Sequence, residues 1–254
     1  HAQRVHIIKT GMNGNANDMP RDTYTALIDE AHKRNLKVAA HLVNLADAQG
    51  LVTAGLDVIA HSIRDRDVDA AFVADLKRRG VGYIPTLTRD LSVFQYESTP
   101  PYLDDPFFLR GNPVYAPQIA RVKDPSLHEK IRNNPGTGRA KAAFEQALRN
   151  LKLLSDGGVM IAMGTDSGTG TGRWQGYFEH VEMELMVKAG MTPMQTLVAA
   201  TGNAARVMSI DKELGTLQPG KRADFVVLNA DPLADIRNTR AIESVWIDGR
   251  QVGD

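Results

Sequence analysis

The chain has 254 residues, of which 43% are hydrophobic, enough for one large α/β domain or two smaller ones. Lys+Arg total 30 and Asp+Glu total 30, so no charge excess points to nucleic acid or to a membrane surface as a partner. No cysteine is present, which excludes disulfides and thiolate metal sites and leaves His, Asp, Glu and modified Lys as metal ligands.

No apolar run approaches the length of a membrane span. The first residues, HAQRVHIIKTG, lack the basic start and apolar stretch of a signal peptide. We therefore expect a soluble protein. It would be cytoplasmic or, if a signal once stood upstream, periplasmic or secreted.

The first third of the chain alternates short apolar runs with helical patterns. The runs read as strands, and the segments between them have apolar residues at every third or fourth position. The predicted strands are 4–11, 36–42, 56–62 and 81–88, and the predicted helices are 20–35, 45–54 and 67–80. Such alternation indicates βαβ units and a parallel sheet.

Residues 91–139 break this rhythm, because they are rich in Pro, Asp and aromatics and then become polar. We expect a long insertion on the loop face, of the kind that often forms a lid. The alternation then resumes. The predicted elements are a helix over 140–158, a strand over 158–168 and helices over 178–190 and 192–208, the last with Thr192 as N-cap and Pro193 at its first position. The tail holds two short β runs.

Four ionisable residues each close a predicted strand, namely Lys9, His41, His61 and Asp166. The carboxyl ends of parallel strands are where α/β sheets and barrels place their ligands. His41 and His61 lie one βαβ step apart, so neighbouring strands would present neighbouring imidazoles. Two His and a carboxylate form a common ligand set for zinc and similar ions, and a water bound to such an ion becomes a nucleophile.

Each of these residues also has an ordinary reading. A histidine at a strand end is often a hydrogen-bonded structural residue, and Lys9 alone could be a rim lysine. Asp166, in GTDSG, could be a helix N-cap or an Asx-turn residue. The ordered set of four on separate strands favours a metal site for hydrolysis, with Asp166 as proton acceptor.

The chain resembles the amidohydrolase superfamily, in particular the branch of imidazolonepropionase and the Xaa-Pro dipeptidases. The resemblance is carried by VHIIKTG, KVAAHL, DVIAHS, MIAMGTDSG, AGMTPMQTLVAATGNAARVM and the tail GTLQPGKRADFVVLNADPLADI with VWIDGRQV. It implies a (β/α)8 TIM-type barrel beside a small β-sandwich. Residues 1–212 would form the barrel part, with the insertion at 91–139, and residues 213–254 a sandwich segment.

The resemblance also implies the ligands. Lys9 corresponds to a strand-four lysine that carries CO2 as a carbamate, a carboxylate on a long arm. His41 and His61 correspond to ligands on strands five and six, and Asp166 to the strand-eight aspartate that shuttles protons. One or two divalent ions are expected, zinc first among them.

The His-x-His pair that ends strand one in this family is absent from the sequence. Strands four to eight are therefore expected here, and one metal is favoured over two. A half barrel exposes strand edges and a core face. We expect a preceding segment, another polypeptide or a second copy to cover that face, and a homo-oligomer.

The resemblance implies hydrolysis of a C–N bond in an amide, a cyclic amide or a dipeptide. Arg89 is a candidate for binding a substrate carboxylate through its planar guanidinium, with a surface arginine as the alternative. Tyr96 could line a lid or simply pack. His180 could contact the site or lie on a helix surface. Gly168, Gly170 and Gly172 predict a flexible loop, because a P-loop lysine is lacking.

Two other functions stay open at this point. One is a deaminase, or a hydrolase of lactones or cyclic amides, on the same fold. The other is an inert partial barrel that acts only as a scaffold. The missing His-x-His supports the inert reading, and the intact set of Lys9, His41, His61 and Asp166 opposes it.

Overall fold

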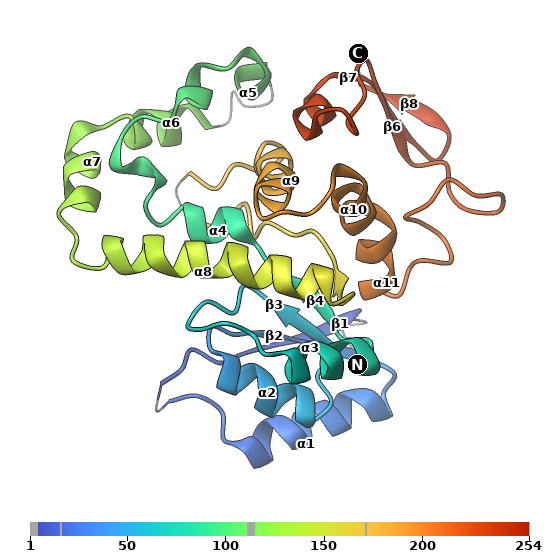
Figure 1. The fold of residues 1–254 in the computed structure, drawn as a ribbon. Coiled ribbons are helices and arrows are strands. Elements are labelled where there is room, and N and C mark those ends of the chain that lie inside the picture. Colours follow the sequence, from blue (N-terminus) through green and yellow to red (C-terminus); the bar gives the residue numbers. More distant parts are fainter. Residues whose placement is uncertain (1–4, 16, 111–114, 171, 254) are drawn as a thin grey trace.

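The computed structural model describes residues 5–15, 17–110, 115–170 and 172–253 and contains a parallel sheet of five strands (Figure 1). The strands lie side by side in chain order, and each is hydrogen-bonded in parallel to the next. They are β1 (Ile7–Gly11), β2 (Lys37–His41), β3 (Val58–Ala60), β4 (Gly82–Ile84) and β5 (Met160–Ile161). The predicted α/β class and parallel sheet are confirmed.

The helices between the strands form where the apolar spacing predicts them. They are α1 (Arg21–Lys33), α2 (Leu45–Thr53), α3 (Ala70–Arg79), α8 (Thr137–Asp156) and α9 (Phe178–Lys188). In α1, Tyr24, Ile28 and Ala31 recur at helical spacing and are buried. Helix α3 is capped at its start by Asp69, whose carboxylate accepts from the Phe72 N–H, and at its end by Gly80 in the left-handed conformation. Figure 1 shows α1, α2 and α3 grouped at one end of the molecule.

The fourth predicted strand is shorter than expected. It ends at Ile84, and the chain turns at Thr86 into a short helix, α4 (Leu87–Leu91). Pro85 has no N–H to continue the ladder, and Thr86 adopts φ 50, outside strand geometry. The prediction of a strand through residue 88 is therefore wrong. This early turn brings α4 against α9 and places Thr86 beside His61.

The segment predicted as an insertion is helical rather than a loop. It contains α5 (Pro106–Arg110), α6 (Ala116–Val122) and α7 (Pro125–Arg132), besides 3-10 turns at Gln95–Glu97 and Pro101–Asp104. These short helices surround an aromatic cluster, with Phe108 and Trp174 buried at its centre. Short helices gain most of their stability from such packing between distant segments, so local composition did not reveal them.

The predicted helix over 192–208 is present but interrupted. Thr192 caps α10 (Pro193–Val198) with a capping box to Gln195, as the Thr-Pro start predicts. A π-helical segment, Ala199–Asn203, then separates it from α11 (Ala204–Val207). The bulge lets the Ala199 carbonyl accept from the Met163 N–H at 3.0 Å, which anchors the chain leaving β5.

The tail forms an antiparallel sheet of three strands, β6 (Phe225–Leu228), β7 (Ile242–Ile247) and β8 (Arg250–Val252). A 3-10 helix, η5 (Ile236–Arg240), precedes β7. The second predicted β run is a hairpin, because Asp248 and Gly249 both have positive φ and form its two-residue turn. The Asp-Gly pair was the signal for it. The division between residues 212 and 213 stays a prediction.

The parallel sheet has two different faces. Val38, Ala40, Ile59 and Tyr83 point into the main core beneath the helices. Residues in the alternate positions, such as Ala39 and Val58, form a small separate cluster on the other face.

In the described part of the chain, β1 and β5 do not pair with each other, so the sheet is open. A closed barrel and a covering partner stay predictions. No described helix has the length and apolar character that a membrane crossing requires.

Candidate metal and hydrolytic site

Lys9 and His41 lie on the same face of two adjacent strands. Lys9 is paired with Ala39 in the parallel register, and His41 follows two positions later, opposite Gly11. Because side chains alternate along a strand, Lys9, Ala39 and His41 share the face that carries the small apolar cluster. Lys9 is exposed and His41 is partly buried. Lys9 therefore lies within β1 rather than at its end.

His61 is brought against His41 at the end of the neighbouring strand. The two ring centroids are 4.5 Å apart in an edge-on arrangement. His61 follows β3 directly, is 2% exposed and has φ 75, a conformation that is uncommon for residues other than glycine. The sequence prediction that neighbouring strands present neighbouring imidazoles holds in the structure.

Thr86 fixes the orientation of the His61 ring. The Nδ1 atom of His61 lies 2.7 Å from Thr86 Oγ1, and both side chains are buried. When Nδ1–H donates to the hydroxyl, Nε2 is left as the ligating nitrogen, the arrangement that metal-binding histidines commonly use. Thr86 was not singled out in the sequence, because its position depends on the turn after β4.

The surroundings disfavour protonation of both imidazoles. Burial lowers the pKa of His61 to about 2, and the cations Arg89 and Lys9, together with His41 when it is protonated, act in the same direction. Burial and the cations Arg89, Arg64 and Lys9 also lower the pKa of His41, while Asp166 acts in the opposite direction. A neutral imidazole is the form that ligates a metal ion, so burial, the largest cause of both shifts, favours ligation.

Asp166 lies five positions beyond β5 in a turn, with φ 54. Its Oδ2 is 3.1 Å from Nη1 of Arg173 and 3.9 Å from Nε of Arg89. Asp166 therefore lies in a loop, and not at the end of a strand as the sequence predicts. The carboxylate is held by two cations, and its side chain is 28% exposed.

Arg89 belongs to α4 and lies at the border of the site. Its Nη1 donates to Asp90 Oδ1 at 2.9 Å, and Arg64 approaches the same oxygen at 3.5 Å. Asp90 is buried, and burial raises the pKa of its carboxyl group. Together with Arg173, these arginines make the region cationic, which suits a substrate that carries a carboxylate.

Two predicted substrate residues lie away from the histidine pair. Tyr96 is 3% exposed in the aromatic cluster, where its hydroxyl accepts from Trp174 Nε1 at 3.0 Å and donates to the Gly172 carbonyl. His180 has Nδ1 2.9 Å from Thr239 Oγ1, and its ring packs edge-on against Phe107. Their contacts are those of packing residues, which agrees with the packing alternative for Tyr96, and their part in substrate binding stays a prediction.

Two glutamates on α9 were missed. Glu179 Oε1 accepts from Thr165 Oγ1 at 3.0 Å and from Ser167 Oγ at 2.9 Å, and so holds both neighbours of Asp166. Glu182 is fully buried and binds the first turn of α4. Both belong to the helical pattern of FEHVEMEL, where charged residues read as solvent-facing. The signal in the sequence that could have revealed Glu182 is its position on the face of the helix that packs inward.

The donor set fits a metal only if Lys9 takes part. Within the described ranges, no three His, Cys, Asp or Glu side chains come together so that they could hold a metal ion. His41 and His61 supply two neutral nitrogens, and a third ligand must come from elsewhere. An ammonium group cannot ligate a cation, whereas a carbamate on Lys9 would supply carboxylate-type oxygens from the face that carries His41.

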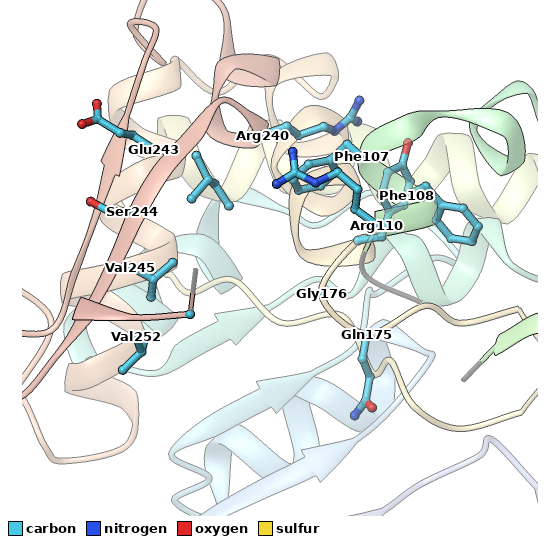
Figure 2. Close-up of a pocket in the computed structure, with 13 residues that line it drawn as sticks. Phe107, Phe108, Arg110, Gln175, Gly176, Arg240, Glu243, Ser244, Val245 and Val252 are labelled. Atoms are coloured by element: carbon cyan, nitrogen blue, oxygen red, sulfur yellow. The ribbon is translucent and has the colours of Figure 1, made fainter. Parts of the chain in front are cut away.

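A cavity of about 410 Å³ lies elsewhere, between α5, residues 175–177 and the C-terminal sheet (Figure 2). Figure 2 shows Phe108 and Arg110 on one side of it and Val245 and Val252 on the other. None of the predicted site residues lines it. Its size alone therefore does not make it the reaction site.

Comparison with known proteins identifies related sequences. Residues 139–252 match the amidohydrolase family. Ochratoxinase of Aspergillus niger is 26% identical over 230 residues, covering 88% of this chain and 39% of that protein. Imidazolonepropionase of Deinococcus deserti is 33% identical over 105 residues, covering 40% of this chain and 26% of that protein. The chain thus spans well under half the length of these curated relatives.

Solved structures share the fold over the whole chain. A putative prolidase from Bifidobacterium longum aligns with a TM-score of 0.74 and 26% identity, over 100% of this chain and 57% of that one. An Xaa-Pro dipeptidase with bound methionine aligns with a TM-score of 0.73 and 21% identity, over 100% and 56% of the two chains.

Proposed function

We propose that this chain, whose residues 139–252 match the amidohydrolase family, hydrolyses a carbon–nitrogen bond with the help of a divalent metal ion. The observation that carries the proposal is the pair of imidazoles of His41 and His61, whose ring centroids are 4.5 Å apart and whose pKa values are both lowered, with the carboxylate of Asp166 acting on His41. The chain spans only part of the length of its relatives, so the activity of the whole protein is itself part of what we propose.

The metal would be held by His41, His61 and a carbamate on Lys9, with zinc as the expected ion. When bound, such an ion polarises the scissile carbonyl and makes a water acidic enough to attack near neutral pH. The burial of His61 keeps its imidazole unprotonated, and Thr86 holds the ring by Nδ1. These residues orient the ligands before a substrate arrives.

Asp166 would accept the proton of the attacking water at a carboxylate oxygen and deliver it to the departing nitrogen. Arg173, 3.1 Å from Oδ2, holds this carboxylate in place. Arg89 has its Nε 3.9 Å from the same oxygen and would bind a carboxylate of the substrate. The substrate would therefore be an N-acyl amino acid, a dipeptide or a cyclic amide with a free carboxylate.

The test is a screen of N-acyl amino acids, cyclic amides and Xaa-Pro dipeptides with zinc, manganese or cobalt, with bicarbonate present. Turnover that disappears with a chelator and returns with metal supports the proposal. Asp166→Asn should lower kcat by about 100-fold or more, as expected for loss of a general base. The surface variant Asp156→Asn, which alters a carboxylate paired with Lys152, should leave kcat unchanged. No turnover with any metal would favour the inert partial barrel.

A further inference from the structure

Glu182 is a fully buried carboxylate on α9 that the proposed chemistry does not use. Its side chain has no solvent exposure. Oε1 accepts from the Leu87 N–H at 2.7 Å, and Oε2 accepts from the N–H and the hydroxyl of Thr88, both at 2.7 Å. Burying a charge without such partners is costly, so three donors from one turn indicate that Glu182 and this turn are matched to each other.

The turn that Glu182 binds begins with Thr86, which precedes Leu87. Thr86 has φ 50, an unfavourable conformation for a β-branched residue that persists only where the surroundings enforce it. With the N–H groups of Leu87 and Thr88 fixed on Glu182, the Thr86 hydroxyl points to Nδ1 of His61, 2.7 Å away. A chain of contacts therefore runs from α9 through the start of α4 to the His61 ring.

A second branch leads from the same carboxylate toward Asp166. The Thr88 hydroxyl, besides its bond to Glu182, lies 3.3 Å from the carbonyl oxygen of Thr165. Thr165 directly precedes Asp166 and is itself buried. Glu182 thus binds a turn that contacts His61 through Thr86 and contacts the residue before Asp166 through Thr88.

We propose that Glu182 is a positioning residue. By binding the turn at residues 86–88, it holds the Thr86 hydroxyl where it accepts from Nδ1–H of His61, and it thereby leaves Nε2 of His61 as the ligating nitrogen. The orientation of His61 is a property of this chain alone, and its consequence for catalysis rests on the proposed function. Glu182 does not reach the substrate or the metal itself.

A residue that only filled space at this position would have a different effect. Glutamine has nearly the same size, but only one of its two terminal atoms is an acceptor, so its NH2 group would meet the N–H of Leu87 or the donors of Thr88. Glu182→Gln therefore keeps the volume and breaks the match. Glu184 offers a matched control two positions along α9, because it pairs with Arg240 and has no described contact with α4.

The experiment records the nitrogen NMR spectra of the histidine side chains in the metal-free protein. The wild-type protein should show His61 as the Nδ1–H tautomer, with its signal identified by its loss in His61→Asn. In Glu182→Gln the His61 signal should move toward a mixture of tautomers. His128, whose Nε2 is 2.7 Å from the Val122 carbonyl, is an internal reference that should not move. Glu184→Gln should reproduce the wild-type spectrum.

Two further variants keep the test decisive if Glu182→Gln does not fold. Glu182→Asp retains the charge on a shorter arm and should shift the His61 signal part of the way. Thr86→Val should shift it fully, because the hydroxyl is lost, whereas Thr86→Ser should restore the wild-type signal. With a substrate from the screen, Glu182→Gln should lower kcat by about 10-fold, in the range known for residues that orient metal ligands.

Three results would overturn the proposal: an Nε2–H tautomer of His61 in the wild type, an unchanged His61 signal in a folded Glu182 variant, or equal movement of all histidine signals. The spectra need neither metal nor substrate. A failed screen with the expected spectra would therefore reject the proposed function and leave the role of Glu182 standing, and the reverse outcome would reject only the role of Glu182.

Discussion

Nδ1 of His61 lies 2.7 Å from Oγ1 of Thr86, although 25 positions separate them in the chain. Both residues have positive φ, and both are buried. Strained backbone at two residues in contact destabilises the fold unless the surrounding packing compensates for it. Such residues are found most often at functional sites. This contact gives the first prediction.

Thr86→Val should weaken zinc binding by about 10-fold or more, because Nδ1 of His61 loses its hydroxyl partner and the ring can turn. Competition with a chromophoric zinc chelator measures the affinity, in buffer that contains bicarbonate. Thr86→Ser retains the hydroxyl and should bind zinc as the wild type does. Equal affinities for the valine and serine variants would contradict the role given to this hydroxyl.

Lys9→Met should abolish tight metal binding, because the remaining described donors include no set of three His, Cys, Asp or Glu. The wild-type protein should lose metal affinity when CO2 and bicarbonate are removed and regain it when bicarbonate returns, since the proposed ligating group is a carbamate. Elemental analysis after gel filtration measures the metal content. Lys33→Met, on the exposed surface of α1, is the control. Metal retained by Lys9→Met would eliminate the carbamate from the site.

The stability of the protein should depend on pH through Glu182. Burial raises the pKa of Glu182 from 4.5 to about 7, and the negative charge of Asp90 acts in the same direction, against the hydrogen bonds from Thr88 and Leu87. Between these two pH values the folded state binds a proton that the unfolded state has released. Stability therefore falls as the pH rises through this window, by about 3 kcal/mol for this shift.

Glu182→Gln should remove that part of the pH dependence. Urea unfolding gives the free energy of unfolding of both proteins at several pH values between 4.5 and 7. The difference between the two free energies should change with pH by the contribution of Glu182. The other ionisable groups are the same in both proteins, so their contributions to the pH dependence cancel in this difference. Glu184→Gln should follow the wild type across the range. A difference that stays constant with pH would show that Glu182 titrates normally.

Asn150→Ala should destabilise the fold by about 3 kcal/mol, because it leaves several buried backbone groups unpaired. Asn150 is fully buried on α8. Its amide donates to the carbonyls of Ile63 and Arg66, both at 2.8 Å, and accepts from the Val68 N–H at 3.0 Å. These bonds hold the loop that follows His61. Chemical denaturation measures the loss. Asn133→Ala, at an exposed helix end, should cost far less.

The sequence by itself determined the parallel sheet, the main helices and the pairing of His41 with His61. These depend on local patterns: apolar runs, helical spacing, a Thr-Pro cap and the rule that parallel strands end at one edge. Lys9 was also placed correctly on the strand before His41, although within the strand rather than at its end.

Only the tertiary structure decided the short helices α5, α6 and α7, the position of Asp166 between Arg173 and Arg89, and the contacts of Thr86 and Glu182. Each depends on contacts between segments that lie far apart in the chain. The turn that follows Thr86 binds a carboxylate of α9, which lies 94 positions after Thr88. No local pattern encodes such a partner, so the physical reason for the shape of the site lies in packing rather than in propensity.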